Sequence, residues 1–146
     1  MLRSNLTLAL SLLAPHIALG ASCTELIDHL STSQTLKGFL EQATTQAASC
    51  GTSLQTGGAR STYCYVSYAY RSAQANNALA HLDTTLSTCF ERRIPSGAGE
   101  IVNHPDSFNQ IEYCDASGTY SLSLKDKAGL GETLIFLTST PNQHCP

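Results

Sequence analysis

Charged residues are scarce in this chain of 146 residues: Asp, Glu, Lys and Arg make up 13% of it, against about 25% in an average soluble domain. Lys and Arg number 8 and Asp and Glu number 11. There is no basic excess to neutralise phosphates, so we expect no nucleic-acid partner. Polarity comes instead from hydroxyl groups, because Ser and Thr supply roughly a quarter of the residues. The 42% of hydrophobic residues is too high for a disordered chain.

Long hydrophobic runs are also lacking. One short apolar stretch follows Arg3 and precedes the small residues of Ala18-Leu19-Gly20, a pattern typical of a secretory signal peptide. We therefore expect residues 1–20 to be a cleaved signal peptide and residues 21–146 to form a single domain. The stretch is shorter than the roughly 20 residues that cross a bilayer, and no later segment comes close to that length. The sequence thus predicts a secreted or periplasmic protein with no membrane span.

The sequence has no Cys-x-x-Cys motif, which argues against a thioredoxin-like redox pair and against a zinc ribbon. The cysteines are nevertheless numerous and even in number, and all of them follow the predicted cleavage site: Cys23, Cys50, Cys64, Cys89, Cys114 and Cys145. An even set of cysteines in an exported protein predicts structural disulfides. No acidic loop has calcium-ligand spacing, so we expect no metal and no cofactor.

The pattern of apolar and turn residues predicts an α+β domain with the element order α-α-β-α-β-β-β. The clearest helix follows Ser72, where apolar residues recur at alternating spacings of four and three. The other predicted elements are two helices within 24–50, the second over 35–49; a strand over 62–70 after a loop at 51–60; an irregular stretch at 92–108; and strands over 110–114, 119–126 and 132–139. Short turns between the last three predict a meander. We expect one antiparallel sheet of about four strands, with the helices on one face.

This arrangement suggests a disulfide pairing. A helical hairpin would bring Cys23 and Cys50 to one end. A helix that folds back along its preceding strand would bring Cys89 to Cys64. The first and third strands of a meander run parallel, so Cys114 and the tail carrying Cys145 would meet at one edge. We therefore predict the pairs Cys23–Cys50, Cys64–Cys89 and Cys114–Cys145.

The tyrosine-rich strand is the best candidate for a binding surface. Alternation along the strand sends Tyr63 and Tyr65 to the face opposite Cys64, which we expect to face the helices. In the meander, Ser121, Ser123 and Lys125 would lie on the same open face. Tyrosines and hydroxyls with few charges are typical of adaptable binding surfaces. A purely covering role for the two tyrosines is the alternative.

Catalytic signatures are missing: there is no Gly-x-Ser-x-Gly motif and no His-Glu-x-x-His motif. The best catalytic candidate is the segment His104-Pro105-Asp106-Ser107, because it contains a histidine close to a carboxylate. The same residue types are also typical of an ordinary turn. Binding is therefore favoured over catalysis. The leading hypothesis is an inhibitor, immunity or accessory protein that holds a protein or a small polar ligand with the open sheet face and the 92–108 loop. The alternative is a small secreted hydrolase with His104 and either Asp106 or Glu112 as its acid/base pair; a purely structural envelope protein is a third possibility.

Overall fold

The computed structural model describes residues 23–55, 57–96 and 108–145. In chain order, these residues form α1 (Cys23–His29), α2 (Ser33–Thr44), β1 (Ser49–Leu54), β2 (Arg60–Ala69), α3 (Ala73–Ser87), β3 (Arg92–Ser96), β4 (Phe108–Asp115), β5 (Gly118–Lys127), the short 3₁₀ helix η1 (Ala128–Leu130) and β6 (Glu132–Pro141). The described chain is thus an α+β domain with three α-helices, as the sequence predicts, but with six strands rather than about four.

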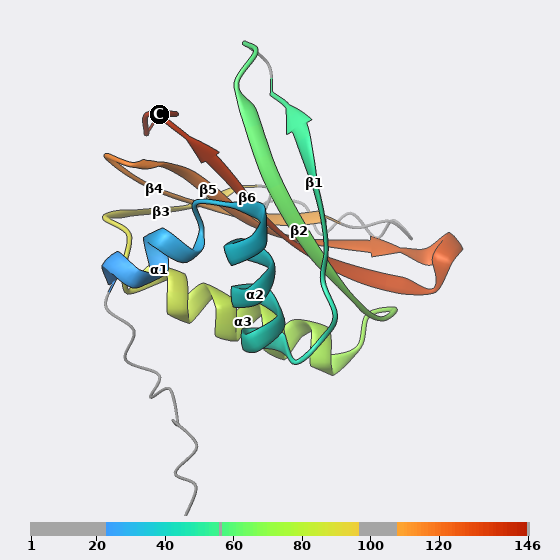
Figure 1. Cartoon of the computed structure of the whole chain (residues 1–146). Coiled ribbons are helices and arrows are strands. Elements are labelled where there is room, and N and C mark those ends of the chain that lie inside the picture. Colours follow the sequence, from blue (N-terminus) through green and yellow to red (C-terminus); the bar gives the residue numbers. More distant parts are fainter. Residues whose placement is uncertain (1–22, 56, 97–107, 146) are drawn as a thin grey trace, which may run out of the picture.

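All six strands belong to one antiparallel sheet in the order β1-β2-β6-β5-β4-β3. The last three strands form the predicted meander, and β6 lies in the centre of the sheet between β2 and β5. The three helices lie on one face, with α3 crossing beneath the sheet between β2 and the far edge strand β3 (Figure 1). The other face carries no described helix.

The hydrophobic core lies between the helices and the sheet. Leu36 and Leu40 of α2 and Leu82 and Leu86 of α3 are fully buried against the strands. The sheet contributes Cys64, Val66, Tyr113, Leu122, Ile135 and Leu137, all fully buried. Burying one leucine or isoleucine side chain is worth about 1.5–3 kcal/mol, so this face makes a large hydrophobic contribution to the stability of the domain.

The second helix ends earlier than predicted, at Thr44 instead of residue 49. Thr45 adopts a left-handed conformation (φ 57°), which stops the helix. The Glu41 carboxylate then accepts the Ala48 N–H at 2.9 Å and the Lys37 ammonium at 2.8 Å, and these contacts lower its pKa. The helix begins at Ser33, two residues before the predicted start, because Thr32 and Thr35 form a reciprocal capping box.

The two strands missing from the prediction are the two edges of the sheet. We expected a loop where β1 pairs with β2, and an irregular segment where β3 pairs with β4. β1 has no buried residue, so its sequence carries no alternation of core-facing apolar side chains from which a strand could be predicted. Edge positions also tolerate Pro95 in β3. Of the predicted 92–108 loop, residues 92–96 are therefore a strand, and residues 97–107 lie outside the described residues.

Two of the three predicted disulfide pairs are wrong. Cys50 belongs to β1 and not to a helix end, so it lies directly opposite Cys64 with a Cα–Cα distance of 4.0 Å and bonds to it. Cys89, at the end of α3, bonds to Cys23 at the start of α1, with the Cα atoms 5.0 Å apart. Figure 1 shows α1 beside this end of α3. The predicted pair Cys114–Cys145 is confirmed.

Among the described residues, no helix combines the length and the hydropathy that a membrane crossing requires.

Candidate functional site

The open face of the sheet is the candidate site, and strand register sets its layout. Neighbouring strands place Tyr65, Phe136, Ser123 and Gln110 in one row across β2, β6, β5 and β4. The adjacent row contains Tyr63, Thr138, Ser121 and Glu112. Within each row an aromatic side chain comes from β2, a hydroxyl from β5 and a longer polar side chain from β4. The face therefore changes from aromatic to polar across the sheet.

This face is hollowed rather than flat, with a volume of about 830 Å³. Small-molecule sites usually measure about 300–1,000 Å³. The side chains that line the hollow are Ser53, Gln55, Tyr63, Tyr65, Gln110, Glu112, Thr119, Ser121, Ser123, Lys125, Leu134, Phe136, Thr138, Thr140, Gln143 and His144. All five residues that the sequence indicates for binding are among them, so the structure brings them together on one surface.

Three aromatic rings form a cluster on the β2 side of the hollow. The ring centroid of Phe136 lies 5.1 Å from that of Tyr65 and 6.0 Å from that of Tyr63, with the rings tilted against each other. These are normal separations for favourable aromatic pairs. The two tyrosines are only partly buried, so the cluster still presents aromatic surface to the hollow.

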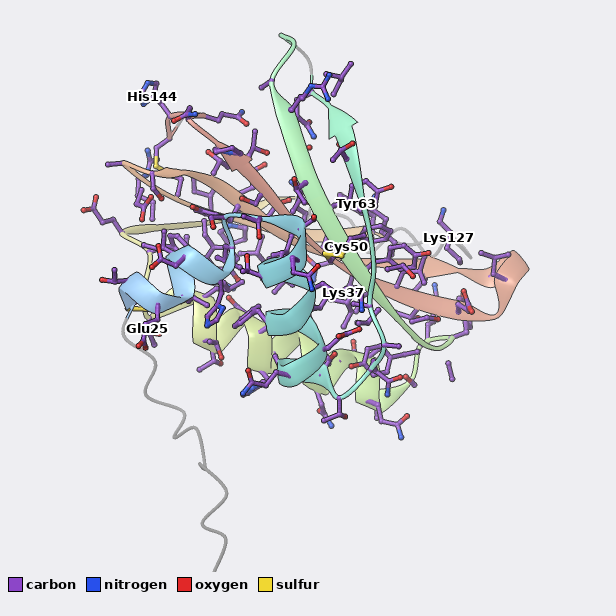
Figure 2. All side chains as sticks on the ribbon, viewed as in Figure 1. Glu25, Lys37, Cys50, Tyr63, Lys127 and His144 are labelled. Atoms are coloured by element: carbon purple, nitrogen blue, oxygen red, sulfur yellow. A yellow bond between two sulfur atoms is a disulfide. The ribbon has the colours of Figure 1, made fainter. Side chains whose placement is uncertain are left out.

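Gly51 explains how Tyr63 is placed. The two residues are register partners on β1 and β2. A Cβ atom built on Gly51 would lie 2.6 Å from the Tyr63 hydroxyl oxygen and 2.8 Å from Cζ, so the tyrosine ring lies across β1 where a larger residue would project. Figure 2 shows Tyr63 on the strand pair β1–β2, above the helices in that view. The glycine is thus required by the close approach of the ring.

Lys125 marks another corner of the hollow. Its ammonium nitrogen lies 4.7 Å from the ring centroid of Phe136 and 5.4 Å from that of Phe108. Both distances are within the range of cation–π attraction. Lys125 forms no ion pair with any residue that the structure describes. The local charge is therefore held by two rings rather than by a carboxylate.

The floor of the hollow consists of hydroxyl groups. Ser123, Thr119 and Thr140 are buried, whereas Ser121 and Thr138 are partly exposed. The Thr119 hydroxyl donates to the Gln143 carbonyl at 3.0 Å, which ties the C-terminal tail to the sheet. A hydroxyl group can donate and accept hydrogen bonds at once, so this floor can match ligand groups of either kind.

Only one of the three catalytic candidates can be placed. Glu112 lines the hollow and accepts a hydrogen bond from the Gln110 side-chain amide at 3.0 Å. His104 and Asp106 lie outside the described residues. His144 is exposed at the rim (Figure 2), held there through the neighbouring Cys114–Cys145 disulfide. Among the residues described, no group of three or more His, Cys, Asp or Glu side chains could hold a metal ion.

A cluster of charge-assisted hydrogen bonds around Asp83 lies away from the hollow. Arg93 donates to both carboxylate oxygens of Asp83, at 2.8 and 2.7 Å, and the Tyr113 hydroxyl donates to the same group at 2.6 Å. The bond from Arg93 is the main reason that the pKa of Asp83 falls to about 2, with smaller contributions from Tyr113 and Ser87. Burial and the Asp83 carboxylate raise the pKa of Tyr113. This cluster fastens α3 to β3 and β4, so its role is structural.

A second hollow, of about 930 Å³, lies where α2 and α3 meet the ends of β2 and β6. His81 and Tyr68 line it, and burial raises the pKa of Tyr68. None of the binding residues that the sequence indicates lies there.

Sequence reasoning missed Phe136, Thr138 and Gln110 as parts of the site. Phe136 had a readable signal: residues 134–137 are apolar throughout, so alternate side chains must face the side away from the helices. The register of β6 against β2 was not readable, because it pairs residues about seventy positions apart in the chain.

No known family of proteins has a sequence profile that matches this chain, and no curated protein matches it significantly in sequence.

Proposed function

We propose that this protein is a small exported binding module that holds a small polar ligand in the hollow of its open sheet face. One observation carries the proposal: a hollow of ligand size that no described helix covers, lined by an aromatic cluster, a hydroxyl floor, one ammonium and one carboxylate from the described residues. Binding sites for small molecules combine such aromatic surface with a few placed polar groups.

Export is supported by the cysteines. All six are paired in three disulfides, which persist in oxidising compartments. The N-terminal sequence pattern points the same way. A secreted or periplasmic location would expose the open face to molecules outside the cytoplasm.

A small ligand fits the shape better than a large protein partner does. The core of a protein interface is usually well packed and apolar, whereas this face is concave and its floor is made of hydroxyls. An inhibitor or accessory role would require a partner that projects a segment into the hollow. The hydrolase alternative gains no support from the described residues, because Glu112 is hydrogen-bonded to Gln110 and its proposed histidine partner lies outside them.

The experiment is a ligand screen by nuclear magnetic resonance on the oxidised, ¹⁵N-labelled protein. We expect the amide shifts that change on binding to concentrate on residues 61–67, 110–112, 119–125 and 134–140. A Tyr65→Ala variant should lose these changes, while a His81→Ala variant, altered in the second hollow, should keep them. If the shifts concentrate instead around the second hollow, or if no compound in a chemically diverse set binds, the proposal is wrong.

A further inference from the structure

We infer that the ligand of the open face is a neutral oligosaccharide, which stacks on Tyr63 and Tyr65 and hydrogen-bonds to the hydroxyl floor. The inference rests on the proposed function and adds the chemical class of the ligand. Three features of the hollow support it: the distribution of charge, the two-way hydrogen-bonding capacity of the floor and the position of the exposed rings.

Charge argues for an uncharged ligand. Among the residues that the structure describes, the hollow contains one ammonium group, on Lys125, and one carboxylate, on Glu112. Lys125 is the register partner of Phe108. Because Phe108 lies four positions before Glu112 on β4, the backbones of Lys125 and Glu112 are roughly 13 Å apart. That separation exceeds the Debye length of about 8 Å at physiological salt. A phosphorylated or sulfated ligand would find a single ammonium that already lies over two rings.

The floor has the hydrogen-bonding character that a sugar needs. Each hydroxyl of a saccharide is both a donor and an acceptor, and so is each serine or threonine hydroxyl of the floor. Ser121 and Thr138 are register partners, as are Thr119 and Thr140, so hydroxyls occur on adjacent strands about 4.8 Å apart and at alternate positions along each strand. Gln110 and Glu112 extend the polar surface beyond the floor. A ring bearing several hydroxyls can thus make bonds at several points at once.

The rings supply the apolar half of sugar recognition. One face of a pyranose ring presents mainly C–H groups, which favour the electron-rich face of an aromatic ring. Phe136 has the Lys125 ammonium 4.7 Å from its centroid, so its ring is already engaged. All three rings of the cluster are partly exposed, but only Tyr63 and Tyr65 also carry a hydroxyl that can bond to the ligand at the ring edge. We therefore assign stacking to the two tyrosines.

The test is titration of the oxidised protein with defined probes, followed by calorimetry and by the amide shifts of the open face. The neutral probes are tetrasaccharides of glucose, mannose, xylose and N-acetylglucosamine. The charged comparators are a sulfated tetrasaccharide and inositol hexakisphosphate. We expect at least one neutral probe to bind, with an affinity that changes less than about twofold when NaCl is raised tenfold, because no charge is neutralised.

Variants then assign the stacking role. Tyr65→Ala should weaken binding of the neutral probe about tenfold or more, while Tyr65→Phe should retain most of it, because the ring remains. Gly51→Ala should also weaken binding, since the new methyl group displaces the Tyr63 ring without removing it. Tyr70→Ala is the matched control: it removes a tyrosine next to the same strand but outside the hollow, and should leave the affinity unchanged. Far-UV circular dichroism checks that every variant is folded.

The outcomes separate this inference from the proposed function. If only a charged comparator binds the open face, or if another compound of the ligand screen binds there and no neutral probe does, the module binds a ligand but the inference is wrong. If Tyr65→Ala and Tyr65→Phe weaken a neutral probe equally, the stacking role is wrong. If nothing binds the open face, both proposals are wrong.

Discussion

The two faces of the sheet are made from the same strands and have opposite characters. On β6, Ile135 and Leu137 are fully buried against the helices, while Leu134, Phe136 and Thr138 alternate with them on the open face. β5 repeats the pattern, with Leu122 on one side and Ser121 on the other. Because alternate residues of each strand serve different faces, stability and surface chemistry are carried by separate residues. Substitutions on the two faces should therefore have separable effects.

The disulfides also belong to one side of the sheet or the other: two lie on the helix-covered side and one lies beside the open face. Cys23–Cys89 joins the start of α1 to the end of α3, and both sulfurs of Cys50–Cys64 lie within 4 Å of the Ser33 carbonyl oxygen at the start of α2. These two fasten the helix-covered side. Cys114–Cys145 instead holds the C-terminal tail beside the open face, where Gln143 and His144 line the hollow.

The largest effect is expected from removing the disulfide between the helices. Replacing Cys23 and Cys89 by alanine opens a loop with a sequence separation of 66, which by loop entropy should lower the free energy of unfolding by about 4 kcal/mol. The same change at Cys50 and Cys64, with a separation of 14, should cost about 3 kcal/mol. Urea denaturation measures both. A larger loss for the shorter loop would show that the cross-strand bond fixes more than chain entropy.

A pair of substitutions on β6, one on each face of the sheet, tests most directly whether the two faces contribute differently to stability. Leu137→Ala should lower the free energy of unfolding by about 3 kcal/mol, because it leaves a cavity in a fully buried site. Thr138→Ala, the next residue on the opposite face, should change it by less than about 0.5 kcal/mol. Urea denaturation again provides the measurement. Equal losses would mean that the open face is part of the core.

The Asp83 cluster predicts how the helix-covered side responds to acid. The pKa of Asp83 is about 2, below the unfolded value of 3.8, so its interactions stabilise the fold above pH 4 and this contribution is lost as the pH falls toward 2. Asp83→Asn should therefore cost about 1–2 kcal/mol at pH 7, allowing for the partial exposure of Arg93, and much less near pH 2. Unfolding curves of the unchanged protein and of Asp83→Asn between pH 7 and pH 2 test whether the difference in the free energy of unfolding shrinks on acidification. A difference that grows on acidification would contradict it.

Much of the fold follows from local patterns in the sequence. The four-and-three spacing after Ser72 yields α3, whose side chains at Ala75, Leu82 and Leu86 are buried. Turn residues between the last strands yield the meander. The edge strand β1 was not predicted because its sequence, SCGTSL, consists mainly of small and polar residues, which obscure any alternation. The wrong disulfide pairs follow from that one omission, since Cys50 in a strand faces Cys64 and leaves Cys89 for Cys23.

The candidate site likewise has features that local sequence patterns predict and features that depend on contacts between distant segments. Alternation within a strand is enough to put Tyr63 and Tyr65 on one face and Ser121, Ser123 and Lys125 on a common face. The pairing of Tyr65 with Phe136 depends on contacts between distant segments, which no local pattern encodes. The sequence could therefore place Phe136 on the open face but could not place it beside Tyr65, nor could it show that Gly51 makes room for Tyr63.

The smallest expected effect is the coupling energy between Lys125 and Phe136. Its size shows whether the Lys125 ammonium is available to an anionic ligand. A double-mutant cycle with Lys125→Met and Phe136→Leu should give a coupling of about 0.5 kcal/mol in the free energy of unfolding, as for a partly exposed cation–π pair. Such coupling means that the ammonium already has a partner, so a charged ligand would have to displace it. Coupling indistinguishable from zero would leave the ammonium available to an anionic group, and the open face would then favour an acidic ligand over a neutral sugar.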